Sequence, residues 1–186
     1  MEASGQGAPG VESAAALYRA HAPFVANFLA KLGVPRQEVE DALQDVFLVA
    51  HRRGGFSPGA AKATTWLAEI GLRVASDRRR ARGRRGSMPD TDHVERAGAD
   101  AVTPEGSAEL SESLAWVDRA LAAIDLEHRA VFVLFELEGE SCADIAAGLG
   151  IPVGTVHSRL HTARRVFRNH YERLLSARAR YAGEAL

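Results

Sequence analysis

Apolar residues recur with a helical period along most of the chain. The clearest stripe runs from Val39 to Ala50, where apolar side chains fall three and four residues apart and so share one face of a helix. The same period predicts helices over residues 13–32, from about residue 64 into the 80s, over 110–124, over 129–138, around 145, and from about 153 into the 170s. No stretch of useful length alternates as a strand would, so the pattern predicts an all-α fold.

Two segments lack this period. Residues 1–12 are rich in Gly, Ala, Ser and Pro and are expected to fray, and residues 86–108 are acidic with few large apolar side chains. The second segment is typical of a flexible linker. We therefore predict two small helical domains, over residues 13–85 and 109–180, followed by a short tail over 181–186.

The helical faces also predict the core. In the first domain the inward positions are Val39, Ala42, Leu43, Val46, Phe47, Ala50, Trp66, Leu67, Ile70 and Val74. In the second they are Leu110, Leu114, Val117, Leu121, Ile124, Val131, Leu134, Phe135, Ile145, Leu149, Val156, Leu160, Ala163 and Phe167.

The second domain contains the parts of a helix–turn–helix. Ser141 and Asp144 have capping-box spacing before a short helix, Gly148 to Gly150 break it, and a longer helix begins near Val153. On the open side near the start of that helix, positions able to reach base edges are Thr155, His157, Ser158, Arg159, His161 and Thr162. Positions better placed for phosphates are Arg164, Arg165 and Arg168.

The net charge of −1 conceals strong segregation. Residues 73–85 hold seven arginines and one acid, residues 87–118 hold eight acids and one arginine, and residues 155–180 hold seven arginines and one acid. Two basic blocks separated by an acidic one indicate two surfaces for a polyanion, joined by a segment that avoids it.

Several classes of function lack support. The single cysteine, Cys142, excludes a disulfide framework within the chain and a multi-thiol metal site, and His157 and His161 have no evident third ligand, so no metal is expected. Nucleophile elbows, phosphate-binding loops and dinucleotide fingerprints are absent, so neither catalytic residues nor a cofactor is predicted. No apolar run or leader marks the chain for a membrane or for export, and the cytoplasm is the expected compartment.

Three motifs follow one another along the chain: Glu40 to Phe47, then Thr65 to Ile70 with Asp77 to Arg80, and Ile151 to Arg164. In this order they resemble the extracytoplasmic-function group of bacterial RNA polymerase sigma factors. In that family the first motif binds the clamp helices of the polymerase core, the second melts and reads the minus-ten promoter element, and the third reads the minus-thirty-five element. The resemblance covers roughly Ala14 to Arg168.

The resemblance implies specific contact residues. For core polymerase they are Glu40, Asp41, Gln44, Asp45 and Leu48, and Leu48 is also an apolar residue on an otherwise polar face. For the minus-ten element they are Arg73, Asp77, Arg78, Arg79, Arg80 and Arg82. The helix–turn–helix positions named above would read the minus-thirty-five element.

The implied partners are the core enzyme (its clamp helices and flap), promoter DNA and an anti-sigma factor. Two positions depart from the family pattern: Arg73 stands where Asn is usual, and His157 stands where Lys or Arg is more frequent. The resemblance therefore does not fix the base preference at the minus-ten or the minus-thirty-five element. Two other readings also remain open at this stage, a conventional helix–turn–helix regulator that binds duplex DNA without polymerase and a decoy that occupies core without initiating.

Overall fold

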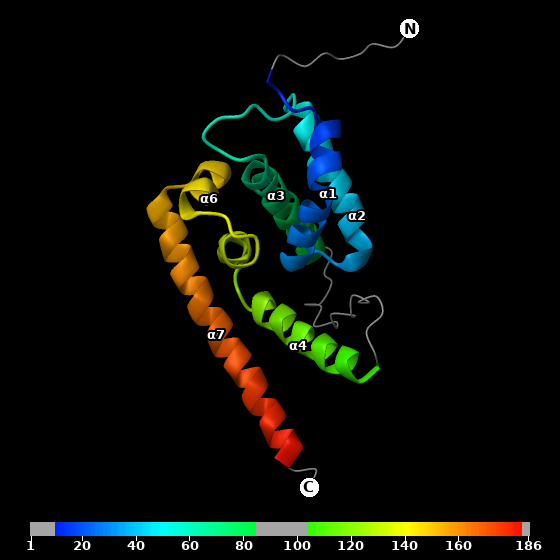
Figure 1. Cartoon of the computed structure of the whole chain (residues 1–186), viewed down its shortest axis with the longest axis vertical. Coiled ribbons are helices and arrows are strands. Elements are labelled where there is room, and N and C mark those ends of the chain that lie inside the picture. The colour runs from blue at the N-terminus through cyan, green and yellow to red at the C-terminus, as the bar shows by residue number, and fades with distance from the viewer. Residues whose placement is uncertain (1–9, 85–103, 184–186) are drawn as a thin grey trace.

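The computed structural model describes residues 10–84 and 104–183, and every regular element in those ranges is helical (Figure 1). One isolated bridge, between Glu12 and Phe56, is the sole extended pairing in the described part. The prediction of an all-α fold is confirmed. None of the described helices is long and apolar enough to cross a bilayer.

The first domain is a bundle of three helices, α1 (Ala14–Lys31), α2 (Arg36–Arg52) and α3 (Ala63–Arg84). Ser13 caps α1 by accepting a hydrogen bond from the amide of Ala16. Gly33, within the short connection from α1 to α2, has a φ of 88°, in the region that favours glycine. Predicted inward residues of α2 and α3, such as Val46 and Leu67, are fully buried. Trp66 and Val74 are only partly buried, at the edge of this core.

The second domain begins with α4 (Pro104–Ala122), continues through α5 (Leu126–Phe132) and a π-helical turn, η1 (Val133–Leu137), and ends with α6 (Cys142–Leu149) and α7 (Val153–Gly183). The expected capping box is present: Ser141 Oγ accepts from the Asp144 amide at 3.1 Å. Gly150 closes α6 in the left-handed region, with a φ of 65°.

Three local expectations differ from the structure. Helix α4 starts at Pro104, inside the segment expected to be linker, because proline suits the first turn of a helix. Leu114, expected in the core, is 48% exposed. The single helix expected over residues 129–138 widens into η1 at Val133. The rest of the predicted linker, residues 86–103, and the side chain of Leu110 lie outside the described residues, as does Arg85 at the end of the first domain.

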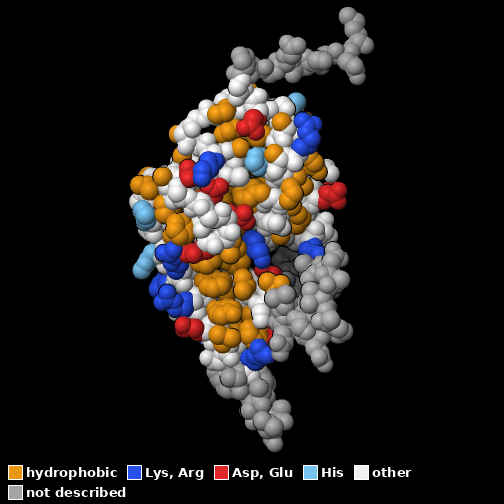
Figure 2. Space-filling model, viewed as in Figure 1, with side chains coloured by type: hydrophobic (Ala, Val, Ile, Leu, Met, Phe, Trp, Pro, Cys, Tyr) orange, Lys and Arg blue, Asp and Glu red, His pale blue; other side chains and the backbone are white. Residues whose placement is uncertain are grey.

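The buried side chains of the two domains form one continuous cluster. Helix α3 packs against α6 and α5, while α7 and α4 extend away from the first domain (Figure 1). Figure 2 shows a band of hydrophobic side chains between α4 and α7, with basic residues along its α7 side. Phe132 of α5 stacks on Phe167 of α7, and Phe167 stacks on Tyr171, with ring centroids 5.1 and 5.8 Å apart.

Candidate nucleic-acid interface

The helix–turn–helix positions predicted to reach DNA lie together on the first turns of α7. His157, Ser158 and His161 are exposed, whereas Thr155, Arg159 and Thr162 are partly buried. Further along the helix Arg164, Arg165 and Arg168 are exposed. Val156, Leu160 and Ala163 are buried against the rest of the domain, so the polar face of α7 is the face left open. These positions therefore share the open face of α7, and their division into base-reading and phosphate-contacting residues stays a prediction.

Two arginines of this face already have partners in the second domain. Arg159 forms a close ion pair with Glu127 at the start of α5. Arg164 pairs with Glu136 at 2.6 Å and lies over the ring of Phe135, 5.2 Å from its centroid. Either arginine must leave its carboxylate to reach a base or a phosphate. The sequence carried no local signal for these pairs, because each joins residues about 30 positions apart.

The second basic surface is the carboxyl-terminal half of α3. Arg73 pairs with Glu69 on its own helix, and Arg80 pairs with Asp77 at 2.9 Å. Asp77, Arg79 and Arg80 are exposed. The guanidinium groups of Arg79 and Arg80 are therefore accessible from solvent along this helix.

Arg78 is different because it is tied to α2. Its guanidinium donates to Asp45 at 2.6 Å and lies 3.5 Å from Glu38, which Arg82 also approaches at 3.8 Å. The side chain of Arg78 is only 23% exposed. Sequence reasoning assigned Asp45 and Arg78 to two different partners, yet the fold joins them to each other. This pair braces α3 against α2.

The polar face of α2 carries the residues predicted to bind a protein partner. Glu40, Asp41 and Gln44 are exposed, and Leu48 is 51% exposed. Leu48 lies at a shallow hollow between α2 and α3, whose lining is Asp45, Leu48, Val49, Arg52, Val74, Asp77 and Arg78. An exposed leucine beside a hollow with a charged rim is typical of a docking surface.

The described residues contain no cluster of three or more His, Cys, Asp or Glu side chains suited to a metal ion. His157 and His161 are exposed on the polar face of α7. Cys142 is partly buried at the start of α6 and packs against the hydrophobic core.

Sequence reasoning missed Arg129, a buried charge at the junction of the two domains. It is 7% exposed and donates to the carbonyls of Leu32, Ala122 and Ile124 over 2.7 to 3.2 Å. Burial, assisted by the positive charge of Arg79, lowers the pKa of Arg129 to about 10. The side chain therefore stays charged at neutral pH. The sequence feature that could have revealed the burial of Arg129 is its place next to Ala130 and Val131, which are buried on α5.

Comparison with known proteins agrees with this arrangement. Residues 17–85 match the family Sigma-70 region 2, and residues 114–166 match the family Sigma-70, region 4. The chain is 32% identical over 149 residues to the ECF RNA polymerase sigma-E factor of Escherichia coli strain K12, covering 76% of this chain and 78% of that protein. This chain belongs to the ECF sigma factors.

Other relatives are similar over most of this sigma factor. It is 34% identical to the RNA polymerase sigma-H factor of Pseudomonas aeruginosa, over 69% of this chain and 70% of that protein. It is 32% identical to the ECF RNA polymerase sigma factor SigE of Mycolicibacterium smegmatis, over 89% of this chain, and spans 64% of the length of that relative.

Solved structures share the fold. The sigma factor RpoE of Bartonella quintana, in complex with the anti-sigma factor NepR, superposes with a TM-score of 0.62 at 25% identity, over 83% of this sigma factor and 94% of RpoE. CnrH, in complex with the cytosolic domain of CnrY, gives a TM-score of 0.58 at 24% identity, covering 88% of each chain, which supports the fold alone. In this sigma factor α7 continues to Gly183, well past the end of the region 4 match at residue 166.

Proposed function

We propose that this sigma factor is a dissociable, non-catalytic initiation factor of bacterial transcription. The observation that carries the proposal is the order of three surfaces along one chain: the docking hollow on α2, the basic half of α3, and the basic helix–turn–helix face of α7. A protein-docking surface followed by two polyanion surfaces fits a factor that positions an enzyme on DNA.

Each surface has a role in this proposal. The exposed polar residues of α2 and Leu48 dock on the clamp helices of the polymerase core. The exposed residues of α3 hold the minus-ten element, where single-stranded DNA needs a basic groove. The first turns of α7 enter the major groove of the minus-thirty-five element, with Arg165 and Arg168 on phosphates. The proposed place of action is the cytoplasm.

The proposal includes control by an anti-sigma protein. RpoE of Bartonella quintana, similar in fold and 25% identical, is bound to one. A protein that covers the hollow on α2 would compete with core polymerase for the same residues. The described side chains carry no signature of the signal that releases such a partner.

The test is multi-round transcription on genomic promoter fragments, with purified sigma factor and core polymerase freed of its own sigma. We expect transcripts with defined starts that disappear when the sigma factor is omitted. Glu172→Ala, which removes an exposed acid of α7 outside the three surfaces, is the matched control and should transcribe as the parent does. Core binding without transcripts would identify a decoy, and tight duplex binding without core binding would identify a conventional regulator.

A further inference from the structure

The open face of α7 carries two histidines in line with two of its arginines. His157 and His161 are both exposed and lie four residues apart, which places them on the same side of the helix. Arg165 and Arg168, also exposed, continue the line at spacings of four and three residues. The four side chains form a stripe along α7, with imidazoles near the start of the helix and guanidinium groups further along.

The charge of this stripe depends on its imidazoles. An imidazole changes charge between about pH 5 and about pH 8, whereas a guanidinium group stays charged throughout. The stripe therefore carries two positive charges when both histidines are neutral and four when both are protonated. The half that changes its charge is the half at the start of α7, where a recognition helix meets the bases.

The acids around α7 are already paired with other residues. The elements beside it are α4, α5, η1 and α6, and the acidic side chains described on them are Glu112, Asp118, Glu127, Glu136 and Asp144. Their basic partners, in the same order, are Arg178, Lys31, Arg159, Arg164 and Lys62. Among the side chains that the structure describes, no carboxylate forms an ion pair with His157 or His161. Both imidazoles are therefore open to an external partner.

DNA offers hydrogen-bond acceptors that suit a protonated imidazole. A neutral imidazole has one N–H donor, and a protonated one has two. Phosphate oxygens only accept hydrogen bonds, and N7 and O6 of guanine are likewise acceptors in the major groove. DNA on this face of α7 therefore favours the protonated form, and protonation favours the binding of DNA by the same factor.

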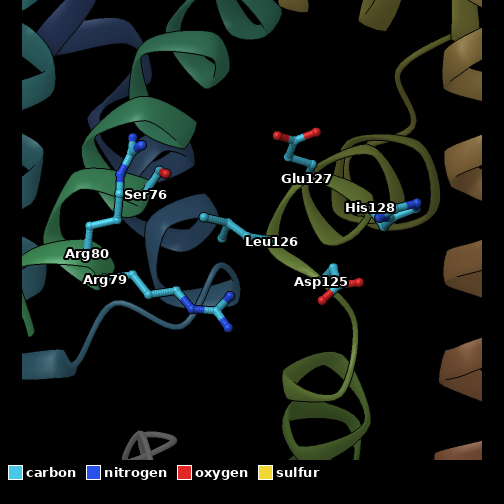
Figure 3. A pocket seen from close by; sticks show the side chains of 7 residues that line it. All are labelled: Ser76, Arg79, Arg80, Asp125, Leu126, Glu127 and His128. Atoms are coloured by element: carbon cyan, nitrogen blue, oxygen red, sulfur yellow. The ribbon is translucent and has the colours of Figure 1, made fainter. Parts of the chain in front are cut away.

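Two further histidines of the second domain lie outside the stripe. His170 is exposed and follows His161 by nine residues, which is about two and a half turns, so it lies on the opposite side of α7. His128 of α5 lines an open hollow whose other wall, on α3, includes Arg79 and Arg80 (Figure 3). Replacement of either histidine removes an imidazole without changing the stripe.

The contact between the two domains also contains titratable groups and needs a measurement of its own. A Cβ placed on Gly148 of α6 would lie 2.3 Å from the Cβ of Thr65, so α6 lies very close to the start of α3. Beside this approach Lys62 pairs with Glu140 and with Asp144, each at 2.9 Å. This packing of α6 on α3 is called closure below, and a readout of closure separates it from the charge of the stripe.

We propose that His157 and His161 are proton-dependent DNA contacts, so that the helix–turn–helix face of this sigma factor binds DNA more tightly at acid pH than at alkaline pH. The proposal deepens the DNA-binding role proposed above and rests on it. Arg165 and Arg168 supply the part of the binding that does not vary with pH.

Counterion release sets the size of the effect. Each protonated imidazole that neutralises a phosphate steepens the slope of log affinity against log salt concentration by about 0.9. At about 0.1 M salt this corresponds to roughly eightfold in affinity for each histidine, and so to about 60-fold at most for the two together.

The test measures binding of the full chain to a fluorescent duplex of about 40 base pairs and mixed sequence, at about pH 6 and about pH 8. Fluorescence anisotropy gives the affinity at several salt concentrations. We expect the parent to bind at least about tenfold more tightly at the lower pH, with a steeper salt slope. The double variant His157→Lys with His161→Lys keeps both positions charged, so it should bind at the higher pH nearly as tightly as the parent binds at the lower pH.

Two single variants are the controls. His170→Gln is the matched one, because it removes an exposed imidazole from the opposite side of the same helix, and His128→Gln removes the imidazole at the hollow. Both should keep the parental pH dependence.

Closure is followed over the same pH range. Spin labels on cysteines placed at exposed Gln37 of α2 and Asn169 of α7, in a Cys142→Ser background, report the distance between the domains by pulsed electron resonance. We expect the same distance at both pH values. A thermal melt of the double lysine variant checks its fold, which two changes at exposed positions should leave intact.

Equal parental affinity at the two pH values, or no binding of the duplex at either, would overturn the proposal. So would a double lysine variant that keeps the parental pH dependence, or loss of that dependence in His170→Gln or His128→Gln. The duplex measurement needs no polymerase, so it is separate from the test of function. A parent that shows the pH dependence yet neither binds core nor supports transcription would reject the proposed function alone.

Discussion

Charged side chains of this sigma factor that are proposed to meet external partners often meet each other in the free chain. Arg78 holds Asp45, and Arg159 holds Glu127. The Glu127 side chain is 62% exposed, so exchanging it as the partner of Arg159 for a phosphate costs little, whereas Arg78 is only 23% exposed and also braces α3 against α2. Substitution of Asp41 or Arg168 breaks none of these ion pairs. These two residues therefore test the proposed contacts of α2 and α7 more directly.

Arg159 and Arg168 should differ in how their loss affects DNA binding. If Arg159 donates two hydrogen bonds to one base, Arg159→Ala should weaken the free energy of DNA binding by about 1–3 kcal/mol. The same change should relax the base preference at one promoter position. Arg168→Ala should weaken all sequences equally, since a phosphate contact carries no base information. Binding of holoenzyme to a panel of promoter variants measures both. Equal, sequence-independent losses for the two variants would remove the base-reading role of Arg159.

On α2 the informative comparison is between Asp41 and Asp45. Asp41→Ala should weaken core binding with no change in thermal stability, because the side chain is exposed. Asp45→Ala should also release Arg78, and so weaken core binding and loosen α3. A pull-down with core, read beside a thermal melt, separates the two effects. Unchanged core affinity for Asp41→Ala would reject the clamp-docking assignment.

At the scale of elements, capping signals predicted the helices well. Ser141 with Asp144, Gly33 and Gly150 each mark the boundary that the sequence indicated. The exposure of Leu114 and the widening at Val133 were missed, since both depend on how α4 and α5 pack on other helices. The apolar period of a sequence shows which face of a helix is hydrophobic. The helices that pack against that face determine how much of it is buried.

The cap of α6 offers a test at this scale. Ser141→Ala removes the oxygen that accepts from the Asp144 amide, and it should lower the free energy of unfolding by about 0.5–2 kcal/mol. Chemical denaturation measures the loss, with Ser57→Ala in the exposed loop after α2 as the control. A loss no larger than that of the control would show that the cap contributes nothing to stability.

For the whole molecule, the sequence predicted two domains and their surfaces but not the junction between them. Contacts such as Lys62 with Glu140 or Arg129 with Leu32 join residues 78 and 97 positions apart. Their residue types are ordinary for helix surfaces and ends, so no local pattern distinguishes them. The glycine at 148 looked like a helix breaker, whereas in the fold it is the residue that lets the domains touch.

The pairing of Lys62 with Asp144 also predicts how closure depends on pH. Hydrogen bonds from Ser141 and then Lys62 lower the pKa of Asp144 below its ordinary 3.8. Its contribution to closure is present above 3.8 and is lost as pH falls through the depressed value. Hydrogen bonds to Asp144 and then Glu140 raise the pKa of Lys62 above 10.5, so its contribution is present below 10.5 and is lost as pH rises through the raised value.

The interdomain distance should therefore be constant between about pH 5 and about pH 9. The spin-labelled parent measures this directly, and Lys62→Ala is the control because it lacks the pair. Opening within that window would mean that another group governs closure, and His128, which lines the hollow on the side opposite Arg79, is the group to replace first.

The close approach at Gly148 also limits which domains can be exchanged between related sigma factors. Sigma factors of two small domains look interchangeable, as if either half could be exchanged between relatives. Here one buried cluster crosses the boundary, so a second domain taken from a relative with any larger residue at this position would sit apart from the first. Such a hybrid could still reach a promoter, but its two domains would not be held together in the free chain. In this lineage the two halves are therefore expected to change together.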